Sequence, residues 1–253
     1  MIESRHNIFN LYSQYYDLLY LEKEYEAEAA YIDNLIKKYG DGGSSILEFG
    51  SGTGKHGACL VGFGYKVFGI ELSQEMVAQS ISIDGFDCVV GDIRNFKVPQ
   101  KFTAVISLFH VMSYQVNDAD ILAVFENAAE HLNTGGLFIF DFWYSPAVQN
   151  LRPSVKIKRT SDHQTALTRI AEPKAYPNDS RVDVLYDIFI EDLNSGEIKN
   201  LNEIHSMRHF SLFEIRLLAE NFGFEVLTAE EVITGLAPGD STWGICVALQ
   251  KAP

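Results

Sequence analysis

Short apolar runs alternate with helix-like segments between residues 44 and 142 of this 253-residue chain. The runs are rich in Val, Ile and Phe, as is typical of strands that are buried on both faces of a parallel sheet. Alternation of such strands with helices predicts repeated β-α units. We expect strands over Ile46–Phe49, Lys66–Ile70, Cys88–Val90, Ala104–Leu108 and Leu137–Phe142.

Segments with helical periodicity separate these runs. We expect helices over Lys55–Val61, Ser73–Ser80 and Asp120–Leu132, the last of which has a broad apolar face. Two more strands, Phe224–Thr228 and Trp243–Leu249, resume the sheet pattern near the end of the chain. The order of these elements predicts an α/β fold with a doubly wound, Rossmann-like, mostly parallel sheet of seven strands.

Two other segments do not follow the β-α pattern. Residues 8–39 look like two helices that could pack as a lid, whereas residues 153–210 alternate apolar and polar positions, as antiparallel hairpins do. Ser211 then caps a helix over Leu212–Asn221, and Glu214 completes a capping box. We therefore expect an N-terminal helical lid over residues 1–43, a Rossmann-like core over 44–145 and 211–253, and an inserted antiparallel β subdomain over 146–210.

The composition and charge of the chain narrow the classes of function. Acidic residues outnumber Lys and Arg by 34 to 20, and no basic cluster stands out, so we expect no nucleic-acid surface. Three widely spaced cysteines without a C-x-x-C pair indicate neither a disulfide framework nor a zinc site. Since no signal peptide and no run of membrane-spanning length stands out, we expect a cytoplasmic protein that does not enter a membrane.

Glycines are crowded into one region of the chain, because ten of the 19 lie within residues 40–69. There, the first predicted strand runs into an E-x-G-x-G-x-G pattern formed by Glu48, Gly50, Gly52 and Gly54. Glycine lets the backbone bend sharply and approach a ligand closely, and the helix that follows begins with unpaired N–H donors. The pattern therefore predicts a ligand-binding turn.

Two other nucleotide-binding motifs fit this turn less well. A phosphate loop would need a glycine where Phe49 stands and a hydroxyl residue where His56 stands. The dinucleotide fingerprint matches at Gly50 and Gly52, but it places Lys55 at its third glycine, where close packing of the helix disfavours a long side chain. A nicotinamide oxidoreductase is thus the weaker alternative.

The E-x-G-x-G-x-G pattern resembles motif I of class I S-adenosylmethionine-dependent methyltransferases. Three further elements follow in that family's order: Glu71 ends the second run, Gly91-Asp92-Ile93 follows the third, and Leu108-Phe109-His110 follows the fourth. The resemblance implies that Glu71 holds the ribose hydroxyls and that Asp92 accepts from the exocyclic amine of adenine. From the residues alone, Glu71 could instead precede a helix capped by Ser73, and the Gly-Asp pair could be a turn.

By that resemblance the cofactor is S-adenosyl-L-methionine. The tyrosine-rich first helix would lie across its pocket, where aromatic rings suit the positive charge of a sulfonium. No cluster of metal-ligating residues stands out, so we expect no metal. The residues expected to contact the cofactor are Tyr12, Tyr16, Tyr25, Glu48, Gly50, Ser51, Gly52, Gly54, Glu71, Leu72, Met76, Gly91, Asp92, Ile93, Leu108 and Phe109.

The outer parts of the chain bear on the methyl acceptor. The prefix FNLYSQYYDLLYLEKEYEAEAAYI and the segment HSMRHFSLFEI are similar to parts of N-methyltransferases that act on nucleotide-linked amino sugars. This resemblance implies a small-molecule acceptor, the amino group of a nucleotide-linked sugar. O-methylation of a sugar or another small metabolite, and a non-catalytic module that only binds S-adenosylmethionine, stay open as alternatives. The inserted strands could also form the surface of a homodimer.

Candidate catalytic residues lie at the end of a strand and on the first helix. His110 follows the carboxyl end of a core strand, where open α/β sheets bind ligands, and it is our candidate for the general base. The resemblance implies that Tyr16 lies across the cofactor and acceptor pocket, and Tyr16 is the second catalytic candidate. On an unbulged strand His205 and His209 share one face and Arg208 lies on the other, so only one of these sets would meet the acceptor. Asp141 and Trp143, two apart, should also share a face. The residues expected to bind the acceptor are Asp141, Trp143, His205, Arg208 and His209.

Overall fold

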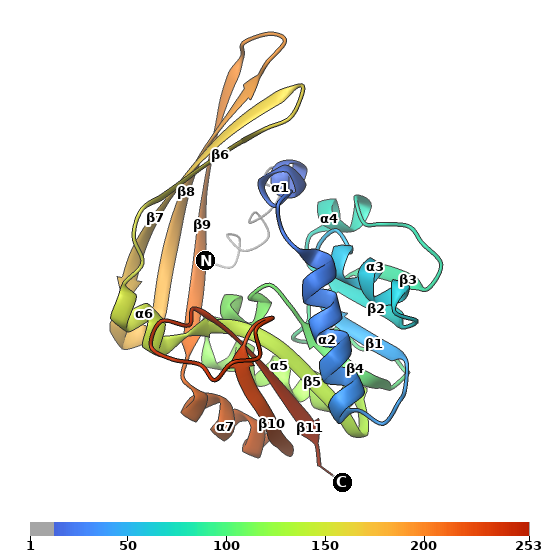
Figure 1. Cartoon of the computed structure of the whole chain (residues 1–253). Coiled ribbons are helices and arrows are strands. Elements are labelled where there is room, and N and C mark those ends of the chain that lie inside the picture. Colours follow the sequence, from blue (N-terminus) through green and yellow to red (C-terminus); the bar gives the residue numbers. More distant parts are fainter. Residues whose placement is uncertain (1–12, 253) are drawn as a thin grey trace.

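The computed structural model describes residues 13–252, which fold as a mixed α/β structure around a large sheet (Figure 1). The core strands lie in the order β3-β2-β1-β4-β5-β11-β10, and β11 runs antiparallel to both of its neighbours. These seven strands confirm the predicted Rossmann-like, mostly parallel sheet. Their bounds are β1 (Ser45–Phe49), β2 (Lys66–Glu71), β3 (Phe86–Val90), β4 (Phe102–Ser107), β5 (Leu132–Tyr144), β10 (Phe224–Glu231) and β11 (Gly244–Lys251).

Helices cover both faces of this sheet, as a doubly wound fold requires (Figure 1). Successive residues of a strand point to opposite faces, so β1 contributes to two separate cores. Leu47 and Phe49 pack with Phe125 of α5, whereas Ile46 packs with Ile32 of α2 on the other face. The helices of the core are α2 (Tyr25–Tyr39), α3 (Lys55–Gly62), α4 (Gln74–Ala78), α5 (Asp118–His131) and α7 (Leu212–Asn221).

Four long antiparallel strands extend the sheet beyond β5 in the order β9-β8-β7-β6. We call these strands the arm, which rises away from the core in Figure 1. The arm joins the core where β9 pairs in parallel with β5 at Trp143–His209 and Tyr144–Phe210. The strands of the arm are β6 (Lys156–Ser161), β7 (Thr165–Tyr176), β8 (Arg181–Asp192) and β9 (Ile198–Phe210). The division of the chain into domains stays a prediction.

The short helix α1 (Ser13–Leu19) stands between the core and the arm (Figure 1). Its Leu19 is fully buried against Leu167, Ile188 and Ile190 of the arm. This packing gives α1 a fixed position next to the open end of the core sheet. The second N-terminal helix, α2, begins at Tyr25.

Three local features differ from the sequence expectations. β5 begins at Leu132, earlier than expected, because that residue pairs with Phe102 across an irregularity in the register. The 3-10 helix η1 (Val111–Tyr114) and the helix α6 (Ser145–Leu151) were not expected. Pro146 at the start of α6 was a usable signal, since proline is favoured in the first turn of a helix.

No helix within the described residues 13–252 is long and apolar enough to cross a lipid bilayer.

The capping box of α7 gives a prediction about stability. Ser211 Oγ accepts a hydrogen bond from the Glu214 N–H, and Glu214 Oε2 accepts one from the Ser211 N–H at 2.7 Å. Ser211→Ala should destabilise the protein by about 1 kcal/mol, which lowers the melting temperature by about 2–4 °C for a chain of this size. Ser211→Asp keeps a capping acceptor and should melt close to wild type in calorimetry. Equal melting of Ser211→Ala and wild type would contradict this role of the cap.

Candidate functional site

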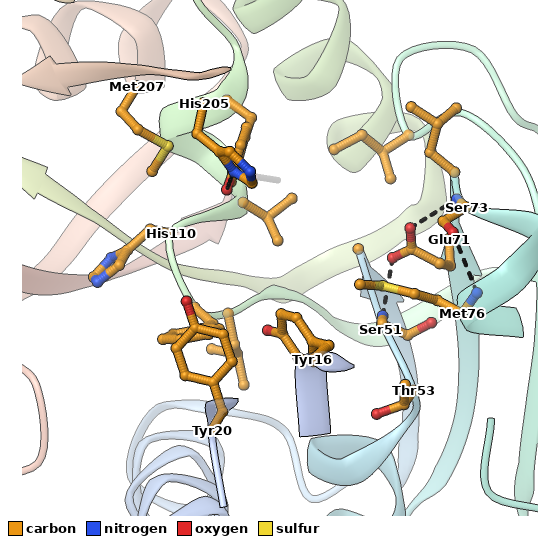
Figure 2. Close-up of a pocket in the computed structure, with 18 of the residues that line it drawn as sticks. Tyr16, Tyr20, Ser51, Thr53, Glu71, Ser73, Met76, His110, His205 and Met207 are labelled. Carbon is orange, nitrogen blue, oxygen red and sulfur yellow. Dashed lines mark hydrogen bonds between the residues drawn. The ribbon is translucent and has the colours of Figure 1, made fainter. Parts of the chain in front are cut away.

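A single cavity of about 1000 Å³ lies at the carboxyl ends of the core strands and extends to the arm. Figure 2 shows Glu71, Ser73 and Met76 on one side of it and His110 and His205 on the other. The structure brings most of the predicted site residues to the wall of this cavity. They are Tyr16, Tyr25, Gly50, Ser51, Gly52, Glu71, Leu72, Met76, Gly91, Asp92, Ile93, Leu108, Phe109, His110, Trp143 and His205.

The three glycines of the turn after β1 all have positive φ but serve different needs. A Cβ at Gly50 would lie 2.6 Å from Val111, and one at Gly54 would lie 2.5 Å from the Phe86 ring, so packing excludes a side chain at both positions. A Cβ at Gly52 would meet nothing nearer than the sulfur of Met76, at 3.9 Å. Gly52 therefore leaves space for a ligand, whereas Gly54 does not line the cavity.

Glu71, at the end of β2, ties this turn to the next helix. Its Oε2 accepts the N–H of Gly52 at 2.9 Å, and its Oε1 accepts the N–H of Ser73 at 2.8 Å. Burial raises the pKa of Glu71, and these N–H donors oppose that rise. Ser73 also caps α4 by accepting the N–H of Met76. The sequence left two alternatives here, a Glu71 that faces a ligand or a helix capped by Ser73. In the structure Glu71 lines the cavity and Ser73 also caps α4.

Glu48, the acidic residue of the glycine motif, lies beneath the turn rather than on the cavity wall. Its side chain is buried, and its Oε2 has no hydrogen-bond partner among the described residues. A Cβ on Gly57 of α3 would lie 2.8 Å from that oxygen, so the helix packs directly against the carboxyl group. Burial, with a further contribution from the charge of Glu71, raises the pKa of Glu48 to about 8. The carboxyl group is therefore largely protonated at neutral pH.

Asp92 follows β3 and is held by a neighbouring arginine. Arg94 donates from Nε to Asp92 Oδ1 at 2.8 Å and also donates to Asp120 of α5 at 2.9 Å. Burial acts to raise the pKa of Asp92, but the hydrogen bonds from Arg94 lower it overall. Asp92 therefore presents an ionised carboxylate to the cavity, with Gly91 and Ile93 beside it.

Tyr16 of α1 and Tyr20, which follows this helix, lie in the middle of the cavity (Figure 2), and Phe109, which follows β4, also lines the cavity. The ring centroids of Tyr16 and Tyr20 are 4.7 Å apart, and those of Tyr20 and Phe109 are 5.0 Å apart. Burial raises the pKa of Tyr16 well above its usual value, so its phenol stays neutral. Asp17 fastens α1 to the core through Lys55 at 2.9 Å and Thr53 at 3.2 Å.

His110 lies across the aromatic group from Glu71 (Figure 2), directly after Phe109. Its backbone N–H donates to Asp141 Oδ1 at 2.8 Å, and its Nδ1 lies 3.2 Å from Asp141 Oδ2. Its ring packs edge-on against Trp143, which in turn packs edge-on against Trp243. His110 and Trp143 line the cavity, whereas Asp141 lies behind them.

His205 reaches the cavity from the inner face of the arm. Its Nδ1 pairs with the Tyr114 hydroxyl at 2.8 Å, and its Nε2 pairs with Glu203 Oε2 at 2.9 Å. Burial raises the pKa of Tyr114 well above its usual value, so the phenol keeps its proton. Sequence reasoning missed several lining residues. Arg169, Tyr186 and Glu203 are among them because only the pairing of distant strands brings them here, and Tyr114 is another because η1 was not expected.

Five predicted site residues do not reach the cavity wall. His209 bonds to Ser145 Oγ at 2.8 Å, and burial lowers its pKa. Arg208 lies on the other face of β9 and donates to Asp118 at 2.7 Å. The five are Glu48, Gly54, Asp141, Arg208 and His209. Tyr12 lies outside the described residues.

No group of three or more His, Cys, Asp or Glu side chains that could hold a metal ion occurs in the part of the chain that the structure describes.

Comparison with known proteins agrees with this geometry. A protein-family model with the description methyltransferase domain matches residues 20–229 of the chain. A Streptomyces venezuelae protein named dTDP-3-amino-3,4,6-trideoxy-α-D-glucopyranose N,N-dimethyltransferase is 27% identical over 88% of this chain and 95% of its own. The solved structure of Streptomyces venezuelae DesVI matches with a TM-score of 0.79 at 23% identity, over 93% of this chain and 97% of its own. That of the sugar N-methyltransferase KedS8 from Streptoalloteichus matches with a TM-score of 0.80 at 20% identity, over 94% and 93%. At these identities the structures show a shared fold.

The buried carboxyl of Glu48 predicts a specific dependence of stability on pH. An ordinary glutamate has a pKa of about 4.3, and Glu48 in the folded protein has a pKa of about 8. At pH values between these two, the Glu48 carboxyl is protonated only in the folded state. Unfolding then releases a proton, so this contribution to stability is full below about pH 4.3 and is lost as the pH rises to about 8. Glu48→Gln should not show this loss. The melting temperature of the variant minus that of wild type should therefore rise by about 5 °C or more from pH 5 to pH 8.

Thermal melts without ligand at several pH values measure this difference. Glu126→Gln, which changes an exposed carboxylate on α5, is the matched control and should follow wild type at every pH. A difference between Glu48→Gln and wild type that is the same at pH 5 and pH 8 would show that Glu48 ionises normally.

Proposed function

The chain belongs to the methyltransferase domain family, and from that premise we propose that it transfers a methyl group from S-adenosylmethionine to the amino group of a nucleotide-linked sugar. One observation carries the proposal. A glycine turn, the Glu71 carboxylate and Asp92 meet at one end of a single cavity whose other end holds His110 and His205. A bound nucleoside and a second substrate would thus share one enclosed space.

The residues at the nucleoside end fit this cofactor chemically. Each oxygen of Glu71 accepts one backbone N–H and keeps capacity for another donor, as ribose hydroxyls provide. Asp92 supplies an ionised acceptor for the exocyclic amine of adenine, and Ile93 and Met76 supply apolar surface for the ring. The missing side chain at Gly52 leaves space for the cofactor. We therefore assign this end of the cavity to S-adenosylmethionine.

When bound, S-adenosylmethionine supplies a methyl group on a positively charged sulfur, which an electron pair of the acceptor can attack. The rings of Tyr16, Tyr20 and Phe109 suit that charge through cation–π attraction. Holding the reactants in line contributes about 7–11 kcal/mol to lowering such a barrier, and the packed α1 helix provides that rigidity. His110 accepts the proton that the acceptor loses. A general base typically contributes about 10² to 10⁴ in rate, and the contribution is smaller where the acceptor is an amine.

The acceptor end supports a nucleotide-linked amino sugar. Lys156 and Arg169 line the same cavity from β6 and β7, and positive side chains suit the phosphate groups of such a compound. The Streptomyces venezuelae relative carries the name of an enzyme that acts on a compound of this class. The expected homodimer stays a prediction, for which Ile157 and Leu185 of the arm offer exposed apolar surface.

A binding experiment tests the nucleoside end. Glu71→Gln keeps the size of the side chain but loses its charge and half of its acceptor capacity, so affinity for S-adenosylhomocysteine should fall at least about tenfold. Isothermal titration calorimetry measures the loss, with Glu126→Gln as a control that binds like wild type. A nicotinamide enzyme would instead bind NADH in the same assay. Unchanged affinity of Glu71→Gln would remove Glu71 from the nucleoside site.

A turnover experiment tests the acceptor. Labelled S-adenosylmethionine is incubated with nucleotide-linked amino sugars and their neutral counterparts, and mass spectrometry detects the methylated product. We expect methylation of an amino sugar and none of its neutral counterpart. His110→Ala should lower kcat for the amine by about 10 to 100-fold, because an amine needs less help from a base than a hydroxyl does.

The other outcomes of that experiment separate the alternatives. Methylation of neutral sugars alone would make the protein an O-methyltransferase, and His110→Ala should then nearly abolish turnover. Tight cofactor binding without any methylated product would indicate a non-catalytic module. Unchanged turnover of His110→Ala with every acceptor would remove His110 from the chemistry.

A further inference from the structure

Asp141 of β5 holds both the backbone and the ring of His110. The His110 N–H donates to Asp141 Oδ1 at 2.8 Å, while Nδ1 of the ring lies 3.2 Å from Oδ2. His110 and the preceding Phe109 both have a φ near 60°, a conformation that is uncommon for residues other than glycine and costs free energy. The backbone hydrogen bond to Asp141 therefore stabilises the turn that aims the ring.

The two nitrogens of the His110 ring have different surroundings. Nδ1 is buried, and none of the described residues meets hydrogen-bonding geometry with it, which leaves Asp141 Oδ2 as its near polar neighbour. The side chain as a whole is 27% exposed, so its exposed surface belongs to the other ring atoms. A Cβ at Gly244 of β11 would lie 3.2 Å from Cε1 and 3.9 Å from Nε2, so the missing side chain lets this edge of the ring pack closely against β11.

We propose that Asp141 is a positioning residue that keeps the proton of neutral His110 on Nδ1 and thereby presents the electron pair of Nε2 to the acceptor. A neutral imidazole carries one proton, and a carboxylate oxygen beside Nδ1 favours that nitrogen as its site. When the acceptor nitrogen loses its proton, that N–H bond breaks and a new N–H bond forms at Nε2, giving an imidazolium beside the Asp141 carboxylate. The role as proton acceptor rests on the proposed function, whereas the position of the proton in the free protein does not.

His205, another histidine of the cavity, has surroundings that differ from those of His110. Both ring nitrogens of His205 already have partners, the Tyr114 hydroxyl at Nδ1 and the Glu203 carboxylate at Nε2. His205 cannot accept a further proton without giving up the hydrogen bond from Tyr114, because its ring has no other acceptor site. His110 has a carboxylate at one nitrogen and cavity at the other edge, which suits a base.

Asp141→Asn tests the proposal because the backbone dictates how the amide must turn. The His110 N–H needs an acceptor, so the amide oxygen takes the place of Oδ1 and the NH₂ group faces Nδ1. Nδ1 must then accept a hydrogen bond, which moves the ring proton to Nε2. In protein labelled with ¹⁵N in histidine, NMR should report Nδ1–H for His110 in wild type and Nε2–H in Asp141→Asn, with His110→Ala used to assign the signal.

The kinetic part of the test uses the acceptor that the turnover experiment identifies. Asp141→Asn should lower kcat by about 10 to 100-fold while the KM for the acceptor stays within about twofold, because only proton acceptance is lost. In the His110→Ala background the same change should have no further effect on kcat, since Asp141 acts through His110. Glu203→Gln, the matched change beside His205, should leave the His110 signal on Nδ1.

Each outcome decides a separate point. An Nε2–H tautomer in wild type overturns the proposal without any activity measurement, even if Asp141→Asn fails to fold. So does an Asp141→Asn variant that keeps wild-type kcat, or one whose effect is undiminished in the His110→Ala background. If the tautomer changes as expected but no acceptor is methylated by wild type, the arrangement of the proton stands and the proposed function fails.

Discussion

The buried carboxylate of Glu71 is the constraint on which the cavity depends. A charged group at this depth must find donors, and it finds them in the N–H groups of Gly52 and Ser73. Those two bonds join the end of β2 to the turn after β1 and to the start of α4, so three segments take up one arrangement. The hydrogen bonds to the Glu71 carboxylate therefore fix the relative positions of the segments at this end of the cavity.

The rest of the cavity is assembled from parts that are distant in sequence. Leu19 anchors α1 on the arm, and Asp17 fastens the same helix to Lys55 at the start of α3. Two residue pairs between β5 and β9 attach the arm to the core, which brings His205 opposite the aromatic rings. The end of the cavity at His110 and His205 thus depends on tertiary packing, whereas the end at Glu71 depends on hydrogen bonds between neighbouring loops.

This contrast explains how much could be predicted from the sequence. The strands, the glycine turn and Glu71 leave local signals, namely apolar periodicity and residues at strand ends, and the structure has them where they were expected. The pairing of His110 with Asp141 joins residues 31 positions apart through the β4–β5 contact, and no local pattern marks it. Arg208 lies on the face of β9 opposite His205 and His209, as the strand pattern predicts, but its partner Asp118 lies at the start of α5 and could not be predicted from that pattern. A strand pattern predicts which side chains share a face and does not predict what that face meets.

We propose that Glu71 organises a nucleoside site within this cavity, and a crystal structure of the protein with S-adenosylhomocysteine tests this role most directly. Both ribose hydroxyls should lie within about 2.5–3.0 Å of the Glu71 carboxylate oxygens, while these oxygens keep their bonds to Gly52 and Ser73. A nucleoside bound away from Glu71, or a carboxylate that leaves the turn in order to bind it, would show that Glu71 does not organise the site.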